Sequence, residues 1–407
     1  MAGQDVDLQP LIENQLELLQ AMISPNGAVL ASPNGHYKAH WVRDGLYVLS
    51  GTLYMGLGDL THGLIRAPFS IFHKHWAKIR DGIRRRPDEN YQFLHSRYNP
   101  RHFDEFKDEW GHNQLDMIGL FLYLVAHLPA KGIDVYRHGR KYEDKHLLNQ
   151  ITRYLETLEW WSCPDFGMWE EGPKRNSSST GAVLAGLQGL SNLDDEDLYF
   201  NEAQLRKGRK ALDELLPDES EGRECDLAQL SLIWPYGILD DAQTATVLGR
   251  VEEQLVRDRG VIRYRGDAYY NAADDRRSTT PDSRTGLDLV TYGDEDRKRF
   301  PFSNEGSEAE WPLGLAWLAI VYSKLAKRCF QRDEDHAELK EKARFYLERV
   351  RSSAVPVPGM ALGCIPELYV DGKPNVNTPL TWASAFFLIA AVAYSEIEDR
   401  GVPYTVL

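Results

Sequence analysis

The run Trp110-Gly111-His112-Asn113-Gln114-Leu115-Asp116 leads directly into the apolar segment Met117-Ile118-Gly119-Leu120-Phe121-Leu122. A polar and aromatic loop therefore opens a stretch that is apolar on every side, as is typical of a buried inner helix. Five more loops rich in Trp, Asp or Glu each precede an apolar run in the same way: 40–44, 169–171, 224–226, 304–311 and 365–369. Because helix N-termini carry free N–H groups and positive dipole ends, six such loops indicate helix starts that converge on one polar site.

Hydrophobic periodicity predicts about twelve helices along the chain. Their approximate ranges are 8–23, 43–57, 59–82, 112–128, 143–161, 178–192, 201–215, 226–234, 241–256, 309–328, 335–351 and 379–396. The long Glu-, Lys- and Arg-rich members, such as 335–351, are apolar on one side, which is typical of outer helices. Even-numbered members are richer in Ala, Gly and Leu, so their backbones can approach neighbours closely. This alternation predicts an all-α fold, an (α/α)6 toroid or barrel; a plain α-solenoid is the competing architecture, although the units share no repeat consensus.

One long stretch, from about 258 to 306, interrupts the alternation. It is rich in Asp, Arg, Gly, Ser and Thr and contains one β-like patch, Val261-Ile262-Arg263-Tyr264. A loop of this length is usually functional or disordered. We expect it to form a wall of the polar site.

The composition limits the class of protein. The chain has 407 residues, 43% of them hydrophobic, and no linker divides it, so we expect one domain spanning 1–407. The formal charge of −14 argues against nucleic acid and anionic membranes as main partners. No apolar run is long enough for a membrane span. Four scattered cysteines and the lack of an apolar signal core predict a cytoplasmic protein with reduced thiols, and leave a monomer or a homodimer open.

Two of the loops carry carboxylates suited to acid–base chemistry. Glu170 and Glu171 follow Trp169, and an apolar neighbour and a like charge both disfavour ionisation, so Glu170 can stay protonated and donate a proton to a leaving oxygen. Glu367 precedes the last inner helix and would face Glu170 across the ring. Two opposed carboxylates are what glycoside hydrolysis requires. Solvated loop glutamates remain the alternative interpretation for these residues.

Other loop residues combine flat rings with forked polar groups. Arg43-Asp44 directly follows Trp41, an arrangement that can bind vicinal sugar hydroxyls while the sugar stacks on the indole; an N-cap with a local ion pair is the alternative. The same mixture recurs at Trp110, His112, Gln114 and Asp116, and again at Arg263 and Asp267. The histidines lack metal-ligand spacing, so no metal site is predicted. The chain also lacks H-E-x-x-H, G-x-S-x-G, G-x-x-x-x-G-K and G-x-G-x-x-G motifs.

Taken in order, these motifs resemble glycoside hydrolase family 15, which contains glucoamylases and the glucoamylase-like domains of phosphorylase kinase α and β subunits. The resemblance runs from about 36 to 396. Trp41-Val42-Arg43-Asp44 is similar to the family's W-x-R-D. The runs similar to the kinase-subunit branch are 110–116, Pro164-Asp165-Phe166-Gly167-Met168-Trp169-Glu170 and Glu310-Trp311-Pro312. Those similar to secreted fungal glucoamylases are Trp169-Glu170-Glu171 and the stretch from Arg263 to Asn271.

The resemblance implies roles for individual residues. Glu170 would be the general acid, and Glu367 the general base that activates water for inversion at C1. Glu171 would contact the sugar on the leaving side, and no metal or organic cofactor is implied. The substrate-binding residues expected on these grounds are Arg43, Asp44, Trp41, Trp110, Gln114, Asp116, Trp169, Glu171, Arg263, Glu310 and Trp311.

We therefore expect an exo-acting, inverting α-glucosidase that releases β-glucose from the non-reducing end of short α-glucosides. Isomaltose-type and maltose-type substrates are both open, and trehalose is a weaker third. The two carboxyl groups should lie roughly 6.5–9.5 Å apart, which leaves room for a water. Only a short segment precedes Trp41, so the N-terminal β-sandwich domain of bacterial and archaeal members is expected to be missing.

Two other functions remain as hypotheses. A non-catalytic, glucan-sensing or regulatory module would match the kinase-subunit branch, but the sequence carries no basic amphipathic tail for a partner such as calmodulin. A barrel enzyme acting on another glycan, or a lyase acting on uronates, is the other. The net charge of −14 would repel a polyanionic substrate.

Overall fold

The computed structural model describes residues 8–34, 37, 39–107, 110–193, 195–267, 269–270, 305–357 and 363–398. Its α-helices are α1 (Gln9–Ala21), α2 (Val42–Tyr54), α3 (Gly58–Lys74), α4 (Trp76–Arg84), α5 (Leu115–His127), α6 (Lys141–Leu158), α7 (Ser177–Ser191), α8 (Glu202–Leu215), α9 (Leu230–Ile233), α10 (Asp241–Leu255), α12 (Pro312–Gln331), α13 (Ala337–Ser353) and α14 (Thr381–Ser395). Three 3-10 helices are η1 (Asn90–Gln92), η2 (Pro129–Lys131) and η3 (Leu227–Gln229). Within the described ranges, antiparallel sheets are limited to the pair β1 (His40–Trp41) with β2 (Arg97–Tyr98) and the pair β3 (Tyr369–Val370) with β4 (Lys373–Pro374).

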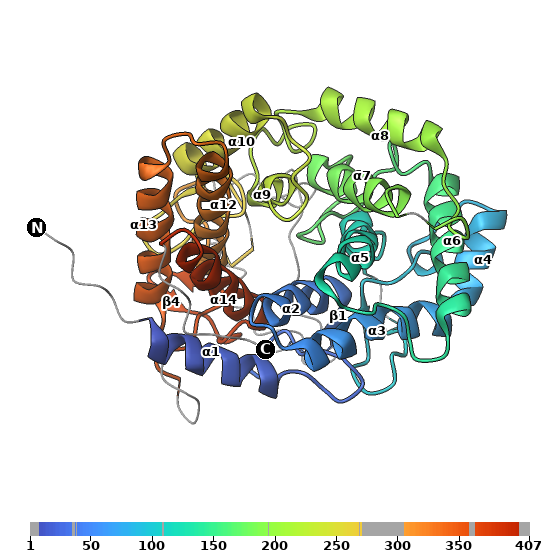
Figure 1. Cartoon of the computed structure of the whole chain (residues 1–407), viewed down its shortest axis with the longest axis horizontal. Coiled ribbons are helices and arrows are strands. Elements are labelled where there is room, and N and C mark those ends of the chain that lie inside the picture. The colour runs from blue at the N-terminus through green and yellow to red at the C-terminus, as the bar shows by residue number, and fades with distance from the viewer. Residues whose placement is uncertain are drawn as a thin grey trace, which may run out of the picture.

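Six helices form an inner ring, and the others surround it (Figure 1). The inner helices are α2, α5, α7, α9, α12 and α14. Each contacts the next along the chain, and α14 contacts α2, which closes the ring. Outer helices pack against this ring: α3 on α2, α8 on α7, α13 on α12 and α1 on α14. The predicted all-α (α/α)6 architecture is confirmed.

One expected helix is two helices in the structure. The range 59–82 contains α3 and α4, which meet at His75, where φ is −100° and ψ is 25°. The apolar periodicity continues across this break, with Phe72 and Ile79 both buried, so the sequence pattern gave no sign of it. In these described ranges no helix combines the length and the hydropathy needed to cross a membrane.

The pattern of buried residues in a helix matches its position in the inner ring or outside it. In α13 the buried residues Ala343, Tyr346, Leu347 and Val350 recur at helical spacing on one face, so this helix covers the ring from outside. In α14 the buried residues run without a break from Thr381 to Ala391, because this helix is surrounded by α1, α2, α12 and α13.

Inner helices approach most closely where glycines face a neighbouring backbone. A Cβ added at Gly119 of α5 would lie 2.3 Å from the carbonyl carbon of Ala182 and 2.5 Å from the nitrogen of Val183, both in α7. A Cβ at Gly186 of α7 would in turn lie 2.6 Å from the oxygen of Gly119. These contacts are with backbone, which cannot move aside as a side chain can. The crossing of α5 and α7 therefore requires small residues.

Gly119→Ala is expected to destabilise the fold by about 1–3 kcal/mol, because the added methyl group must push two packed helices apart. Urea denaturation followed by far-UV circular dichroism measures the change. Gly249→Ala is the matched control: Gly249 also lies inside a helix, but nothing lies within 4 Å of an added Cβ. That variant should be stabilised by roughly 0.5–1 kcal/mol. Equal effects at the two positions would contradict the close-packing argument.

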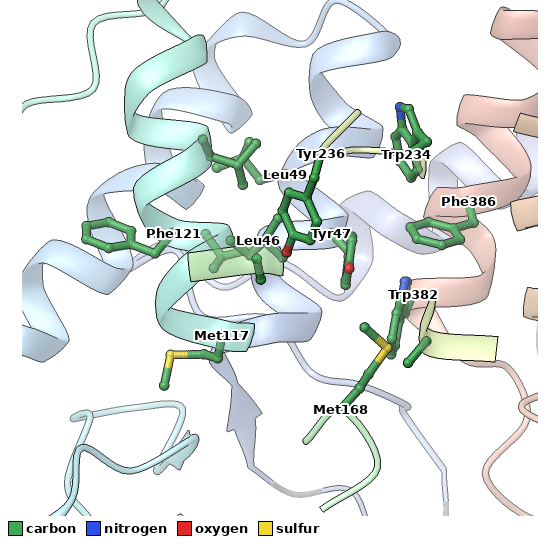
Figure 2. Packing of buried hydrophobic residues seen from close by; sticks show 14 of the residues in the cluster. Leu46, Tyr47, Leu49, Met117, Phe121, Met168, Trp234, Tyr236, Trp382 and Phe386 are labelled. Atoms are coloured by element: carbon green, nitrogen blue, oxygen red, sulfur yellow. The ribbon is translucent and has the colours of Figure 1, made fainter. Parts of the chain in front are cut away.

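The core of the ring reaches the polar site through aromatic side chains. Tyr47 of α2 stacks on Trp382 of α14, with ring centroids 4.7 Å apart and planes inclined by 7°. Phe386, one turn further along α14, meets Tyr47 edge-on at 5.1 Å. Figure 2 shows this cluster, with Met168 beside Trp382 at its edge. Since Met168 and Trp382 also line the pocket described next, the hydrophobic core supports the floor of the site.

Candidate active site

A pocket lies where the inner helices begin, as the loop pattern predicts. Its lining residues are Ala31, Tyr37, Trp41, Arg43, Asp44, Arg97, Trp110, Met168, Trp169, Glu170, Arg263, Tyr269, Trp311, Glu367, Leu380 and Trp382. Five of the six polar loops contribute to this set. The sixth, 224–226, supports the pocket from behind, because Asp226 accepts a hydrogen bond of 2.7 Å from the indole nitrogen of Trp169.

The two expected catalytic carboxylates both line the pocket, on loops that lead to different inner helices. Glu170 lies in the loop that leads to α7, and Glu367 lies in the segment that leads to α14. In the order α2, α5, α7, α9, α12, α14, these two helices are three places apart, and Figure 1 shows them across the ring from each other. Both side chains line the same pocket, so one bound molecule can contact both.

Glu367 is held by neutral donors. One carboxylate oxygen, Oε1, accepts a hydrogen bond from the Tyr37 hydroxyl, and the other, Oε2, accepts from the side-chain amides of Asn375 and Asn377, the latter at 2.9 Å. The side chain is only 1% exposed. Burial, followed by the charge of Glu367, raises the pKa of Tyr37 well above its usual value, so that phenol remains a donor. Three donors therefore fix the orientation of the carboxylate.

Glu170 is placed beside a cation. Its Oε1 lies 3.3 Å from Nη2 of Arg43, whose Nη1 bonds to Oε1 of Gln114 at 2.9 Å and to Oδ2 of Asp116 at 3.1 Å. Burial acts against the charge on Arg43, but Asp116 and Glu170 outweigh it and raise the pKa of the guanidinium. Gln114 and Asp116 are therefore expected site residues that the structure places behind Arg43 rather than in the pocket lining.

The backbone at Glu170 is unusual. Its φ of +61° lies in the left-handed region, which a residue with a side chain adopts at a cost of about 1–3 kcal/mol. Hydrogen bonds from the nitrogen of Glu170 to Gly167 and from the nitrogen of Glu171 to Phe166 hold the turn. Such conformations cluster at functional sites, and this one turns Glu170 and Glu171 in different directions.

Asp44 occupies the first turn of α2 and lines the pocket. Burial raises the pKa of its carboxyl to about 7; the charge of Arg43 acts in the opposite direction, and that of Glu170 adds to the increase. Asp44 can therefore gain or lose its proton near neutral pH.

Arg263 is surrounded by aromatic rings and acids. Its Nε and Nη2 bond to the two oxygens of Asp267 at 2.6 and 2.7 Å, and Nη2 lies 3.3 Å from Oε1 of Glu171. Its guanidinium carbon also lies 4.8 Å from the ring centre of Tyr269 and 5.3 Å from that of Trp169. These contacts fix the guanidinium group of Arg263 before any ligand binds. Glu171 itself does not line the pocket, and in this structure its carboxylate holds Arg263.

Five tryptophans line the pocket: Trp41, Trp110, Trp169, Trp311 and Trp382. Arg97, from β2, stacks on Trp110, with its guanidinium carbon 3.9 Å from the ring centre. Among the described residues the indole N–H groups of Trp110, Trp311 and Trp382 are buried without an acceptor. The tryptophans therefore give the pocket flat apolar faces.

Glu310 is an expected site residue whose contacts lie outside the pocket. Its Oε2 accepts a hydrogen bond of 2.6 Å from the backbone nitrogen of Arg259, and its backbone pairs with Tyr369. It does not appear among the residues that line the pocket. The neighbouring residue Trp311 lines the pocket, because side chains of consecutive residues leave an extended backbone on opposite sides.

Several lining residues were not among the sequence predictions. Tyr37 and Tyr269, whose hydroxyls lie 3.0 Å apart, connect the Glu367 side of the pocket to the Arg263 side. Trp382 lies inside an apolar helical run and gives no sign of facing a pocket. Of the wall expected at 258–306, Arg263 and Tyr269 line the pocket, whereas 268 and 271–304 lie outside the described residues.

Comparisons with known sequences give one family and one group of relatives. The model of the family "Glycosyl hydrolases family 15" matches residues 6–291. "Probable phosphorylase b kinase regulatory subunit alpha" of Caenorhabditis elegans is 25% identical over 424 aligned residues, which cover 91% of this chain and 32% of that protein. The skeletal muscle isoform of the rabbit, Oryctolagus cuniculus, is 21% identical, with 87% and 30% covered. The chain thus spans about a third of the length of these relatives.

Two solved structures with the same fold carry the names of enzymes. A structure described as "Glycosidase Wild Type" superposes with a TM-score of 0.72 at 19% identity, covering 97% of this chain and 99% of that one. Glucoamylase from Saccharomycopsis fibuligera gives a TM-score of 0.58 at 15% identity, with 97% of both chains covered. At these identities the likeness establishes the fold alone.

Proposed function

We propose, from the premise that this chain belongs to glycosyl hydrolases family 15, that it is an exo-acting, inverting α-glucosidase acting on short α-glucosides. One observation carries the proposal. Glu170 and Glu367 line one pocket, on loops that lead to two different inner helices, α7 and α14. Glu170 lies 3.3 Å from the guanidinium of Arg43, and Glu367 accepts hydrogen bonds from Tyr37, Asn375 and Asn377.

In the proposed reaction Glu170 gives its proton to the glycosidic oxygen as the bond from that oxygen to C1 breaks. Glu367 takes a proton from a water molecule that attacks C1 from the opposite face, so the product is β-glucose. Glu367 is suited to the base role because three hydrogen-bond donors fix the direction of its carboxylate at the pocket wall. Two carboxyl groups with one water between them should lie roughly 6.5–9.5 Å apart.

The rest of the pocket fits a single terminal glucose unit. Arg43, Asp44 and Arg263 provide forked donors and an acceptor for vicinal hydroxyls, and the tryptophans provide faces for the C–H sides of the ring. Because this machinery is preorganised by Asp116, Gln114, Glu171 and Asp267, binding requires little rearrangement of the protein.

A proton NMR time course with isomaltose, maltose and trehalose tests the proposal. Initial appearance of the β anomer of glucose, before mutarotation, supports an inverting glucosidase, and the sugar hydrolysed fastest identifies the linkage. Initial appearance of the α anomer would contradict it. The relatives named regulatory subunits favour a second function, a non-catalytic glucan-sensing module. Saturable binding of these sugars without any hydrolysis would support that second function.

Asp44 leads to a pH prediction. Its pKa is raised by burial to about 7, so the carboxylate that accepts two sugar hydroxyls forms only as the pH rises through 7. We expect kcat/KM to increase with pH across this range, mainly through a falling KM. Initial rates between pH 5 and 8.5 give the profile. In Asp44→Asn, kcat/KM should be lower at every pH, and its increase near pH 7 should vanish. If the variant kept the same increase of kcat/KM near pH 7, a group other than Asp44 would be responsible for it.

A further inference from the structure

Asp165 is a buried acid that the proposed mechanism does not use. Its side chain is 1% exposed, and its carboxylate accepts four hydrogen bonds. Oδ2 accepts from the backbone nitrogens of Leu115 and Gly167, at 3.0 and 3.2 Å, and from the hydroxyl of Ser179 at 2.8 Å. Oδ1 accepts from the side-chain amide of Asn176 at 2.9 Å. Within the described part of the chain, no basic side chain forms an ion pair with it.

These four donors belong to the starts of two inner helices, α5 and α7, and to the loop that joins α6 to α7. Leu115 is the first residue of α5, and Ser179 lies in the first turn of α7. Neither helix is capped by its own N-cap side chain, since Gln114 and Asn176 make no capping hydrogen bond there. One carboxylate from outside both helices therefore satisfies the first backbone N–H of α5 and a side-chain hydroxyl in the first turn of α7. The first backbone N–H groups of α7 bond to Glu219 instead.

The start of α5 and the turn after Asp165 carry the two sides of the Arg43–Glu170 contact. Asp116, the second residue of α5, and Gln114, just before it, hold Nη1 of Arg43. Glu170, at the end of the turn that Asp165 begins, meets Nη2 of the same guanidinium. Gly167, whose nitrogen bonds to Asp165, in turn accepts from the nitrogen of Glu170 through its carbonyl. The position of Glu170 relative to Arg43 therefore depends on Asp165.

We propose that Asp165 is a positioning residue for proton transfer from Glu170, and that it acts by tying the start of α5 to the turn that carries the acid. This inference rests on the proposed function. A general acid must lie within hydrogen-bond reach of the leaving oxygen, and a misplacement of about 1 Å can cost on the order of 100-fold in rate. Loss of Asp165 should therefore affect the protonation step more than substrate binding.

Asp165→Asn gives the test, because the substitution keeps the size of the side chain but presents an NH₂ group to one or more of the four donors. Rates are measured on the best natural disaccharide and on α-glucosyl fluoride, whose leaving group needs no proton. We expect kcat on the disaccharide to fall by roughly 100-fold, with KM changed little, while the fluoride rate falls by less than about 3-fold. Glu170→Gln should also lower the disaccharide rate much more than the fluoride rate. Ser179→Ala removes one of the four donors, so it should show the same difference between the two substrates to a smaller extent.

Asp144→Asn is the matched control. Asp144 is a fully buried acid that holds Arg137 at 2.6 Å and His73 at 3.1 Å, in the outer helix α6. It should lower stability without changing the ratio of the two rates. The inference alone would be overturned if folded Asp165→Asn and Ser179→Ala lost equal rates on both substrates while Glu170→Gln still lost mainly the disaccharide rate. A wild-type protein that hydrolyses neither substrate, or a Glu170→Gln variant without selectivity, would overturn the proposed function together with it.

Discussion

Glu367→Gln is expected to lower kcat by about 10²- to 10⁴-fold on every substrate, including α-glucosyl fluoride. An amide cannot take a proton from water, and every leaving group requires an attacking water. The amide keeps the shape of the carboxylate, so KM should change little. Steady-state rates on maltose, isomaltose and the fluoride measure the effect. This uniform loss differs from the selective loss expected for the acid, so the pair of variants assigns the two roles independently.

A carboxylate elsewhere controls for the loss of charge. Glu252 of α10 bonds to the hydroxyl of Tyr346 at 2.7 Å and to Lys342 at 2.9 Å, away from the pocket. Glu252→Gln should leave kcat and KM unchanged. If Glu367→Gln retained a tenth or more of the wild-type rate, Glu367 would not be the base, and a different acceptor would have to be found among the pocket residues.

Arg43→Met is expected to destabilise the protein by about 3–5 kcal/mol and to abolish turnover, because it leaves the buried Asp116 and the adjacent Glu170 without their cation. The side chains of Arg43 and Asp116 are 5% and 3% exposed, so water cannot replace the missing charge. The free energy of unfolding from urea titration measures the loss. Part of it should be recovered in the double variant with Asp116→Asn, which removes one of the acids left unpaired.

An exposed ion pair provides the comparison. Arg86 lies 3.2 Å from Glu159, and both side chains are about half exposed, at 44% and 54%. Arg86→Met should cost at most about 1 kcal/mol, because solvent screens such pairs. Equal losses at Arg43 and Arg86 would show that the Arg43 contacts contribute nothing beyond an ordinary surface pair.

The order of elements was predictable because one pattern repeated. A polar, aromatic loop followed by an Ala- and Gly-rich run placed all six inner helices, and that placement located the pocket at their N-termini. The break at His75 was not predictable, since the apolar face continues from Phe72 to Ile79 across it. The pairing of Arg97 with Trp41 in a two-residue ladder was not predictable either, because a strand of two residues has no periodicity.

The place of Glu170 and Glu367 in the pocket lining was predictable, because each lies in a polar loop that leads to an inner helix; their catalytic roles stay a prediction. The site was less predictable where a side chain could bind either a ligand or another protein side chain. Glu171 and Asp116 have the chemistry of ligand-binding groups, but they hold Arg263 and Arg43 instead. Trp382 has the sequence context of a core residue and also lines the pocket, since its ring lies between the two environments. Local sequence specifies chemistry, and only the tertiary arrangement decides which atoms remain for a ligand.

The closure of the ring by α14 against α2 has a consequence for synthesis of the chain. When the ribosome has produced α12, the nascent polypeptide already contains Arg43 and Glu170 but neither Glu367 nor Trp382. Until α14 emerges, the apolar flanks of α2 and α12 that it will cover have no partner, which makes the incomplete ring prone to aggregation and a client for chaperones. Pairing of such distant segments is also slow. Activity should therefore appear only after the last inner helix has been translated and has docked, rather than accumulating as the chain lengthens.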